Sequence, residues 1–184
     1  MSKIVKKIND IKLINTDFYP DKRGLFYEIY NEKKYKKLGI KDTFVQNSIS
    51  ISKKNVLRGL HFTIKNPQSQ ILTVLEGKIF DCLVDLRFKS KNFLSYYSFI
   101  LKKEKNNQIY MPPGFAHGFC VLSDSAVLHY SASKTYNYKN SNGLIWNDEK
   151  IKIKWPIKKP IISDRDKNFK SVTSLIKSKK LPRI

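Results

Sequence analysis

Two histidines, an aspartate and a tyrosine lie in segments of this chain that are suited to acid–base chemistry. His61 follows Arg58 in the run VLRGLHF, and His117 lies in GFAHGF, where glycines let a ligand approach the backbone. Asp166, in SDRD, can orient an imidazole as a carboxylate orients a general base. Tyr130, in LHYSAS, adds a phenol on a strand. A histidine–aspartate pair with a tyrosine opposite it would place base and acid on two faces of one pocket.

Metal binding is the competing use for the histidines. A metal site in a β-barrel usually takes two histidines at i and i+2 of one strand, with a further histidine and a carboxylate. His61 has no histidine two residues away, and neither His117 nor His129 has a histidine neighbour. We therefore expect neither a metal nor a cofactor. The chain also lacks a serine or cysteine nucleophile motif and a glycine-rich phosphate loop.

The stretch from Val56 to Arg87 combines apolar runs with His61, Asp81 and Asp85. Charged residues are rarely buried without a partner, so this pattern favours a small barrel with a polar interior pocket. Two of the apolar runs are joined by Glu76-Gly77-Lys78, which predicts a tight β-hairpin.

The rest of the chain is also rich in short β-like runs. A helix is expected at 31–39, and the many short strands with one or two short helices predict an all-β antiparallel sandwich or barrel. The expected strands outside the central stretch are at 4–14, 25–30, 43–52, 95–101, 108–111, 119–122 and 126–132, with a short alternating run at 151–155.

Length and composition predict one domain that spans residues 1–184, large enough for a core of its own. No apolar run approaches the roughly 18 residues of a membrane span. The start, MSKIVKKIND, lacks the apolar core of a signal peptide, so we expect a cytoplasmic protein with no membrane partner. Cys82 and Cys120 lie in apolar runs and are predicted to be buried free thiols.

The formal net charge of +21 would ordinarily raise nucleic acid as a partner. The lysines are scattered and never form one long basic segment, so we interpret the charge as a solvated surface and expect no nucleic-acid partner. The positive field still favours an acidic or phosphorylated small substrate.

The few arginines of this lysine-rich chain are more informative. Arg23, Arg58, Arg87 and Arg165 each lie in a compact motif, and the arginine fork suits phosphate and carboxylate in a way that lysine cannot copy. We expect one or two of the four to form structural ion pairs and the others to bind a ligand. Strict alternation places Arg58 and His61 on opposite sheet faces, so both reach one pocket only if Gly59 bulges or Arg58 lies at the barrel mouth.

The chain resembles the dTDP-4-dehydrorhamnose 3,5-epimerases along nearly its whole length. The motifs that carry the resemblance are DKRGLFYE, FVQNSIS, NVLRGLHF, GKIFDCLVDLR, MPPGFAHGF, VLSDSAVLHY, GLIWNDEKIKIKWP and ISDRD. The resemblance implies a cupin double-stranded β-helix, or jelly roll, without metal. It also implies a homodimer that exchanges N-terminal strands and a nucleotide-linked 4-keto sugar as substrate.

The resemblance also implies roles for single residues. His61 matches the general base, Asp166 its dyad partner and Tyr130 the proton donor on the opposite face. The protons at C3 and C5 of a 4-keto sugar are acidified by the C4 carbonyl; removing one gives an enolate, and reprotonation from the other face inverts the centre. The positions that match substrate contacts are Arg23, Glu28, Gln46, Ser48, Arg58, Gln70, His117 and Arg165.

Three residues depart from the family pattern. Gln70 replaces a lysine, Ser141 a glutamate and Ser48 an asparagine. Gln70 matters most, because a lysine there would stabilise the enolate oxygen with a full charge, which an amide lacks.

Three functions remain open from sequence alone. The first is inversion of C3 and C5, converting dTDP-4-dehydro-6-deoxy-D-glucose into dTDP-4-dehydro-L-rhamnose. The second is epimerisation at C3 or C5 only, on another nucleotide-linked 4-keto sugar. The third is a non-catalytic sugar- or polyanion-binding cupin, against which the His61, Asp166 and Tyr130 set argues, because binding alone needs no acid–base pair.

Overall fold

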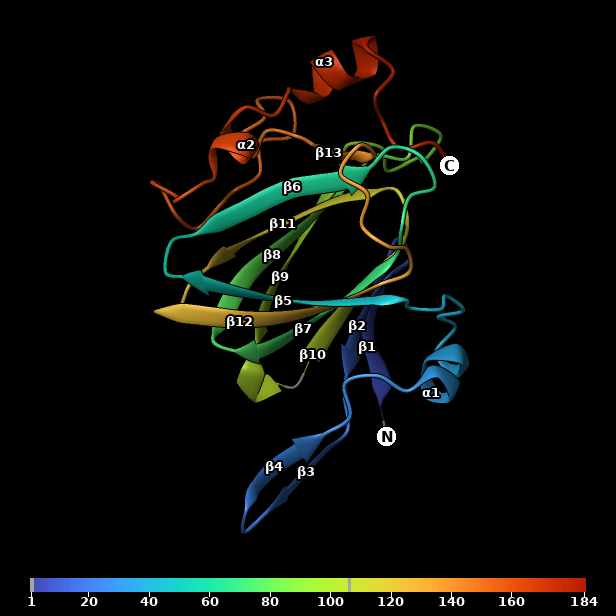
Figure 1. Ribbon diagram of the computed structural model, residues 1–184. Coiled ribbons are helices and arrows are strands. Elements are labelled where there is room, and N and C mark those ends of the chain that lie inside the picture. Colours follow the sequence, from blue (N-terminus) through green and yellow to red (C-terminus); the bar gives the residue numbers. More distant parts are fainter. Residues whose placement is uncertain (1, 106) are drawn as a thin grey trace.

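Two antiparallel β-sheets packed face to face make up most of the computed structural model, which describes residues 2–105 and 107–184 (Figure 1). The six-stranded sheet has the order β1 (Lys3–Ile8), β2 (Ile11–Asn15), β10 (Asn107–Met111), β7 (Gln70–Glu76), β12 (Ser125–Ala132) and β5 (Gln46–Lys53). The five-stranded sheet has the order β13 (Ser141–Gly143), β6 (Leu57–Thr63), β11 (Phe115–Val121), β8 (Lys78–Asp85) and β9 (Tyr96–Lys102).

The chain crosses between the two sheets at almost every step. β5 lies in the six-stranded sheet, β6 in the other, β7 back in the first and β8 in the second, and the alternation resumes from β9 to β13. This winding is the double-stranded β-helix, so the predicted jelly roll is confirmed. Alternate side chains along each strand point into the space between the sheets. Phe115, Phe119 and Val121 of β11 belong to the core there.

The predicted hairpin at Glu76-Gly77-Lys78 is wrong in its pairing. The tight turn exists, with Gly77 at a φ of +80°, but β7 and β8 belong to different sheets and β8 pairs with β11 and β9. A Cβ at position 77 would lie 2.1 Å from the Ser125 carbonyl oxygen, so the corner needs glycine. Turn residues are a local signal, whereas strand partners depend on the whole fold.

The described residues form three short helices where one or two were predicted: α1 (Glu32–Lys37), α2 (Asp164–Lys167) and α3 (Val172–Lys177), with a 3-10 turn, η1, at Lys103–Lys105. α1 matches the helix predicted at 31–39. Asn31 caps its start, and Gly39, with a φ of +73°, follows its end. α2, with four residues, is too short to leave a periodic pattern, whereas α3 is as long as α1 and was not predicted.

The C-terminal segment covers the outer face of the five-stranded sheet, where α2 and α3 lie above β6 and β13 (Figure 1). Val172 and Leu175 pack there with Leu60 and Val84. The run at 151–155, predicted to alternate like a strand, forms no strand. Its apolar residues also join this outer cluster, so their spacing reflects docking onto the sheet and not pairing within it.

The predictions of buried free cysteines and of a structural arginine agree with the structure. Cys82 and Cys120 are free and buried, and burial raises the pKa of the Cys120 thiol to about 12. Arg87 is a structural arginine, because its Nε and Nη2 donate to the two oxygens of Asp85 at 2.9 and 2.8 Å. Within residues 2–105 and 107–184, no helix is long and apolar enough to cross a membrane.

Candidate active site

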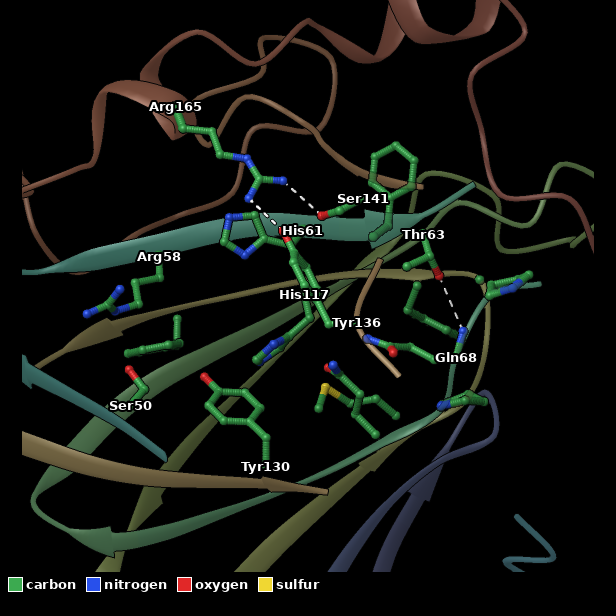
Figure 2. Close-up of a pocket in the computed structure, with 18 residues that line it drawn as sticks. Ser50, Arg58, His61, Thr63, Gln68, His117, Tyr130, Tyr136, Ser141 and Arg165 are labelled. Carbon is green, nitrogen blue, oxygen red and sulfur yellow. Dashed lines mark hydrogen bonds between the residues drawn. The ribbon is translucent and has the colours of Figure 1, made fainter. Parts of the chain in front are cut away.

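A cavity of about 290 Å³ opens between the two sheets (Figure 2). His61, His117 and Arg58 reach it from the five-stranded sheet, and Tyr130 and Gln70 reach it from the six-stranded sheet. The other residues that line it are Ser50, Phe62, Thr63, Pro67, Gln68, Met111, Pro112, Gly114, Phe115, Phe119, Tyr136, Ser141 and Arg165. Residues far apart in sequence therefore converge on one polar pocket, as the charged residues of the central stretch predicted.

His61 and Asp166 form a hydrogen-bonded pair on one wall of this pocket. His61 Nε2 lies 2.9 Å from Asp166 Oδ1, and Asp166 Oδ2 accepts the Gly59 N–H at 2.9 Å. Burial raises the pKa of Asp166, but these hydrogen bonds outweigh it and hold the pKa below its ordinary value. The carboxylate is thus charged at neutral pH and fixes the imidazole, leaving His61 Nδ1 for a ligand.

Local structure explains how Asp166 reaches β6. Ser163 Oγ accepts the Asp166 N–H at 3.2 Å and caps α2, which lies against β6. Phe169, just beyond α2, meets the His61 ring edge-on with centroids 5.6 Å apart. The His61 ring is therefore held at one nitrogen and along one edge.

A β-bulge brings Arg58 and His61 to the same pocket, as the sequence required. His117 pairs with His61 and Phe119 with Arg58, so β6 holds one more residue than β11 between these pairs. Gly59 has a φ of +126° within the bulge, and a Cβ there would lie 2.5 Å from the Gly118 Cα. Only glycine fits this close crossing of the two strands.

Tyr130 lies on the wall opposite His61 (Figure 2). Burial raises the pKa of its phenol far above the ordinary value, and the negative charge of Asp81 raises it further. The phenol is therefore neutral and can donate a proton. His61 and Tyr130 thus face each other across one cavity, the placement that the sequence predicted.

Asp81 is a site residue that the sequence analysis did not assign. Its Oδ1 lies 2.6 Å from His117 Nε2, and neither residue is more than 9% exposed. The signal in the sequence was an aspartate within an apolar strand, because a carboxylate buried there needs a hydrogen-bonding partner. The sequence could not name that partner, because His117 lies 36 residues from Asp81 along the chain.

The two arginines at the pocket are both exposed at its rim. Arg58 Nε donates to Ser52 Oγ at 3.0 Å, and Arg165 Nη2 donates to Ser141 Oγ at 2.8 Å. Tyr136, another residue that sequence reasoning missed, accepts from Arg165 Nη1 at 3.3 Å and is 56% exposed. Neither arginine forms an ion pair with a carboxylate of the described residues, so both have charge to offer an anion.

Gln46, Ser48 and Gln70 also face this side of the six-stranded sheet. Gln70 lines the cavity itself and is half-buried. Ser48 is paired in register with Tyr130, and Gln46 Oε1 accepts the Tyr136 N–H at 2.7 Å. Gln46 and Ser48 therefore lie beside the cavity lining and do not form part of it.

Arg23 and Glu28, also predicted to contact substrate, lie away from this pocket. Arg23 is at the tip of the hairpin β3 (Phe18–Asp21) and β4 (Gly24–Tyr27), which extends away from the sheets (Figure 1). It pairs there with Asp21, and its side chain is 84% exposed. Glu28, just after β4, lies 2.8 Å from Lys34 Nζ.

The described residues contain no group of three or more histidine, cysteine, aspartate or glutamate side chains placed to hold a metal ion. The three histidines contribute to separate arrangements. His61 and His117 each pair with one aspartate, and His129 lies next to Tyr130 in β12, on the other face of the strand.

A jelly roll with a histidine–aspartate pair and a tyrosine on opposite pocket walls defines a cupin with an acid–base site. The chain belongs to the dTDP-4-dehydrorhamnose 3,5-epimerase family, whose sequence profile matches residues 5–174. The dTDP-4-dehydrorhamnose 3,5-epimerase of Shigella flexneri is 38% identical over 170 residues, covering 91% of this chain and 94% of the relative. That of Escherichia coli (strain K12) is 37% identical over 182 residues, covering 97% and 98%.

Solved structures agree with this assignment. The crystal structure of dTDP-6-deoxy-D-glucose-3,5-epimerase from Legionella pneumophila, in complex with dTDP-4-keto-L-rhamnose, matches with a TM-score of 0.93 at 36% identity. The match covers 100% of this chain and 99% of that one. The expected cupin-type fold and family are therefore both confirmed.

Proposed function

We propose that this protein is an isomerase that inverts C3 and C5 of dTDP-4-dehydro-6-deoxy-D-glucose to give dTDP-4-dehydro-L-rhamnose. One observation carries the proposal: the His61–Asp166 pair and Tyr130 occupy opposite walls of one cavity. Family membership supports the same reaction, and a single domain that spans the chain would perform it.

In the proposed mechanism, the bare Nδ1 of His61 removes the proton from C3 or C5. The electron pair of the broken C–H bond moves into the ring, and the C4 carbonyl becomes an enolate. Tyr130 then delivers a proton to the same carbon from the opposite face, which inverts the centre. Asp166 stabilises the imidazolium that forms on His61 and keeps its ring oriented.

The nucleotide end of the substrate fits the rim of the cavity. Arg58 and Arg165 offer planar donors suited to a diphosphate, and the exposed ring of Tyr136 beside Arg165 offers an apolar face to a base. The high net charge of the chain would also favour encounter with an anionic substrate.

We also propose that the enzyme is a cytoplasmic homodimer in which the β3–β4 hairpin serves the partner subunit. The hairpin carries apolar side chains that this chain leaves exposed, with Phe26 at 71% and Tyr19 at 54%. A second copy that covers them would bring Arg23 and Glu28 to a pocket that their own chain does not offer. Free thiols at Cys82 and Cys120 fit a reducing compartment.

A single-centre epimerase is the second candidate. The dTDP-4-dehydrorhamnose 3-epimerase of Streptomyces niveus is 33% identical over 150 residues, covering 80% of this chain and 72% of that relative. The acid–base geometry suits either outcome, because one base and one acid can act at one carbon or at two.

Proton NMR with the dTDP-4-keto sugar in heavy water separates these candidates. Deuterium at both C3 and C5 of the product is expected for the proposed 3,5-epimerase. Deuterium at one carbon would identify a single-centre enzyme. Incorporation at neither carbon would contradict the proposal and favour another substrate or a non-catalytic sugar-binding protein.

A further inference from the structure

A second histidine–aspartate pair lies on the pocket wall beside the proposed proton donor. His117 Nε2 is 2.6 Å from Asp81 Oδ1, and the His117 ring meets the Tyr130 ring edge-on with centroids 6.2 Å apart. Figure 2 shows His117 between His61 and Tyr130. Because Nε2 faces Asp81, Nδ1 is the His117 nitrogen left for a ligand in the cavity.

The surroundings of Asp81 set this pair apart. Asp81 is 0% exposed, and its second oxygen, Oδ2, has no hydrogen-bond partner in the described part of the chain. Its only donor there is His117. A buried carboxylate with one donor is poorly compensated unless that donor brings a positive charge or a second proton.

The number of protons on the His117–Asp81 pair determines its net charge. With one proton, held between Asp81 and Nε2, the pair carries a net negative charge and Nδ1 is a bare acceptor. With two protons the pair is neutral. A proton on Asp81 Oδ2 would have no acceptor in the described part of the chain, so the second proton is better satisfied on Nδ1, toward the cavity, whichever atom holds the bridging one. A low-dielectric interior disfavours net charge, so the two-proton form, with an Nδ1–H donor, is the favoured one.

We propose that the His117–Asp81 pair presents this Nδ1–H to the cavity and stabilises the enolate oxygen at C4, with Asp81 as the positioning residue. This inference rests on the proposed function and deepens it. No proton is transferred from His117: its N–H bond stays intact and donates a hydrogen bond to the oxygen that gains charge.

The other residues of the pocket leave this role open to His117. Gln70 lines the same cavity but is neutral, and a hydrogen bond from a charged donor is about twice as strong as one from a neutral donor. Arg58 and Arg165 are exposed at the rim, where they suit the diphosphate. His117 is the buried donor next to Tyr130, where the reacting carbons must lie.

Nitrogen NMR of protein labelled with ¹⁵N-histidine tests the inference without substrate. His117→Gln assigns the His117 signals by their disappearance. At neutral pH we expect His117 Nδ1 to carry a proton and His61 Nδ1 to be bare. Asp81→Asn removes the charge that holds the second proton, so His117 Nδ1 should become bare in that variant. A bare Nδ1 in the parent protein would overturn the inference.

Kinetics then test the catalytic part. Asp81→Asn should lower kcat by about 10²-fold with little change in KM, because the donor acts mainly on the enolate. An unchanged kcat, with the Nδ1 proton lost, would overturn the role in stabilising the enolate. If Asp81→Asn does not fold, His117→Gln keeps an amide donor without the charge; we expect at least a tenfold lower kcat, and an unchanged kcat would overturn the inference.

Asp85→Asn is the matched control. Asp85 lies in the same strand and is also 0% exposed, but it binds Arg87 and Ser90 and does not line the cavity. This variant should lower the melting temperature while the His117 nitrogen signals and kcat stay those of the parent. If the parent protein shows no epimerase activity, the proposed function fails, whereas the NMR experiment still decides the protonation state of His117.

Discussion

The two histidine–aspartate pairs of the pocket share one contact and differ in what surrounds it. The His61 side chain is 42% exposed, and Asp166 has a second donor in the Gly59 N–H. The His117 side chain is 11% exposed, and Asp81 has no second donor among the described residues. Solvent and the extra hydrogen bond let the first pair keep a net negative charge, so His61 can be a base.

The His117–Asp81 pair has neither the solvent exposure nor the extra hydrogen bond, so His117 is better suited to donate a hydrogen bond. A histidine–aspartate contact therefore does not by itself define a general base. The hydrogen bonds and burial of the carboxylate determine whether the free nitrogen accepts or donates. Tyr130 lies against the buried pair, and burial raises the pKa of its phenol and keeps it protonated.

Among substitutions at Tyr130, Asp166 and Gln70, the largest effect is expected at Tyr130. Tyr130→Phe removes the proton donor but keeps both histidine pairs, so epimerisation should fall on the order of 10³-fold. Deuterium exchange from heavy water into the substrate should fall less, because His61 can still remove a proton and return it. Both rates are read from one NMR time course. Rates equal to the parent would make Tyr130 a structural residue.

Asp166→Asn should have a smaller effect on catalysis, on the order of 10²-fold, because it misorients the base without deleting it. It also tests the pKa of Asp166, which in the folded state lies below its ordinary value of 3.8. The charged carboxylate then stabilises the fold above that pH, and this contribution is lost as the pH falls through the folded-state pKa.

The stability part of this prediction is measured by urea unfolding of both proteins at neutral pH and at about pH 3. The parent should lose more unfolding free energy on acidification than Asp166→Asn does. An equal loss in the two proteins would show that the Asp166 carboxylate does not stabilise the fold.

Substitutions at Gln70 should change turnover by roughly tenfold or less, the equivalent of 1–2 kcal/mol. Gln70→Ala removes a donor from the cavity and should slow kcat, whereas Gln70→Lys adds a charge and should match or exceed the parent. The ratio of the kcat values of Gln70→Ala and Gln70→Lys measures how strongly residue 70 stabilises the enolate. It therefore also shows how much of that stabilisation is left for His117. Indifference to both changes would remove Gln70 from the site.

Chelation should have no effect. Treatment with a chelator is expected to change neither activity nor melting temperature, because His61 and His117 are engaged with aspartates in separate pairs. Elemental analysis of protein purified without added metal provides the check. Stoichiometric zinc, iron or manganese would contradict this expectation.

The sequence predicted much of which residues reach this pocket and less of which residues pair with one another there. The convergence of His61, Asp166 and Tyr130 on one pocket was predicted because each lies in a compact motif with a residue type suited to proton transfer. Alternation alone could not bring Arg58 and His61 to the same cavity, so the sequence left two solutions, a bulge at Gly59 or Arg58 at the barrel mouth. The structure has the bulge, and Arg58 is also exposed at the rim. These inferences use local residue types and spacing, which a sequence contains.

What the sequence could not predict depends on contacts between distant strands. The pairing of Asp81 with His117 requires β8 and β11 to be neighbours, and the turn at Gly77 suggested a different neighbour for β8. The run at 151–155 alternates because it docks on a sheet, a pattern that looks the same as that of a strand. The position of Arg23 depends on where the β3–β4 hairpin points.

The most direct test of the account compares His61→Gln and His117→Gln side by side in heavy water. Both variants replace an aspartate-bound imidazole with the same amide side chain, so the introduced residue is identical at the two positions. We expect His61→Gln to lose exchange at both C3 and C5, and His117→Gln to keep exchange at both carbons at a reduced rate. Full exchange by His61→Gln, or complete loss only in His117→Gln, would contradict the assignment of base and donor.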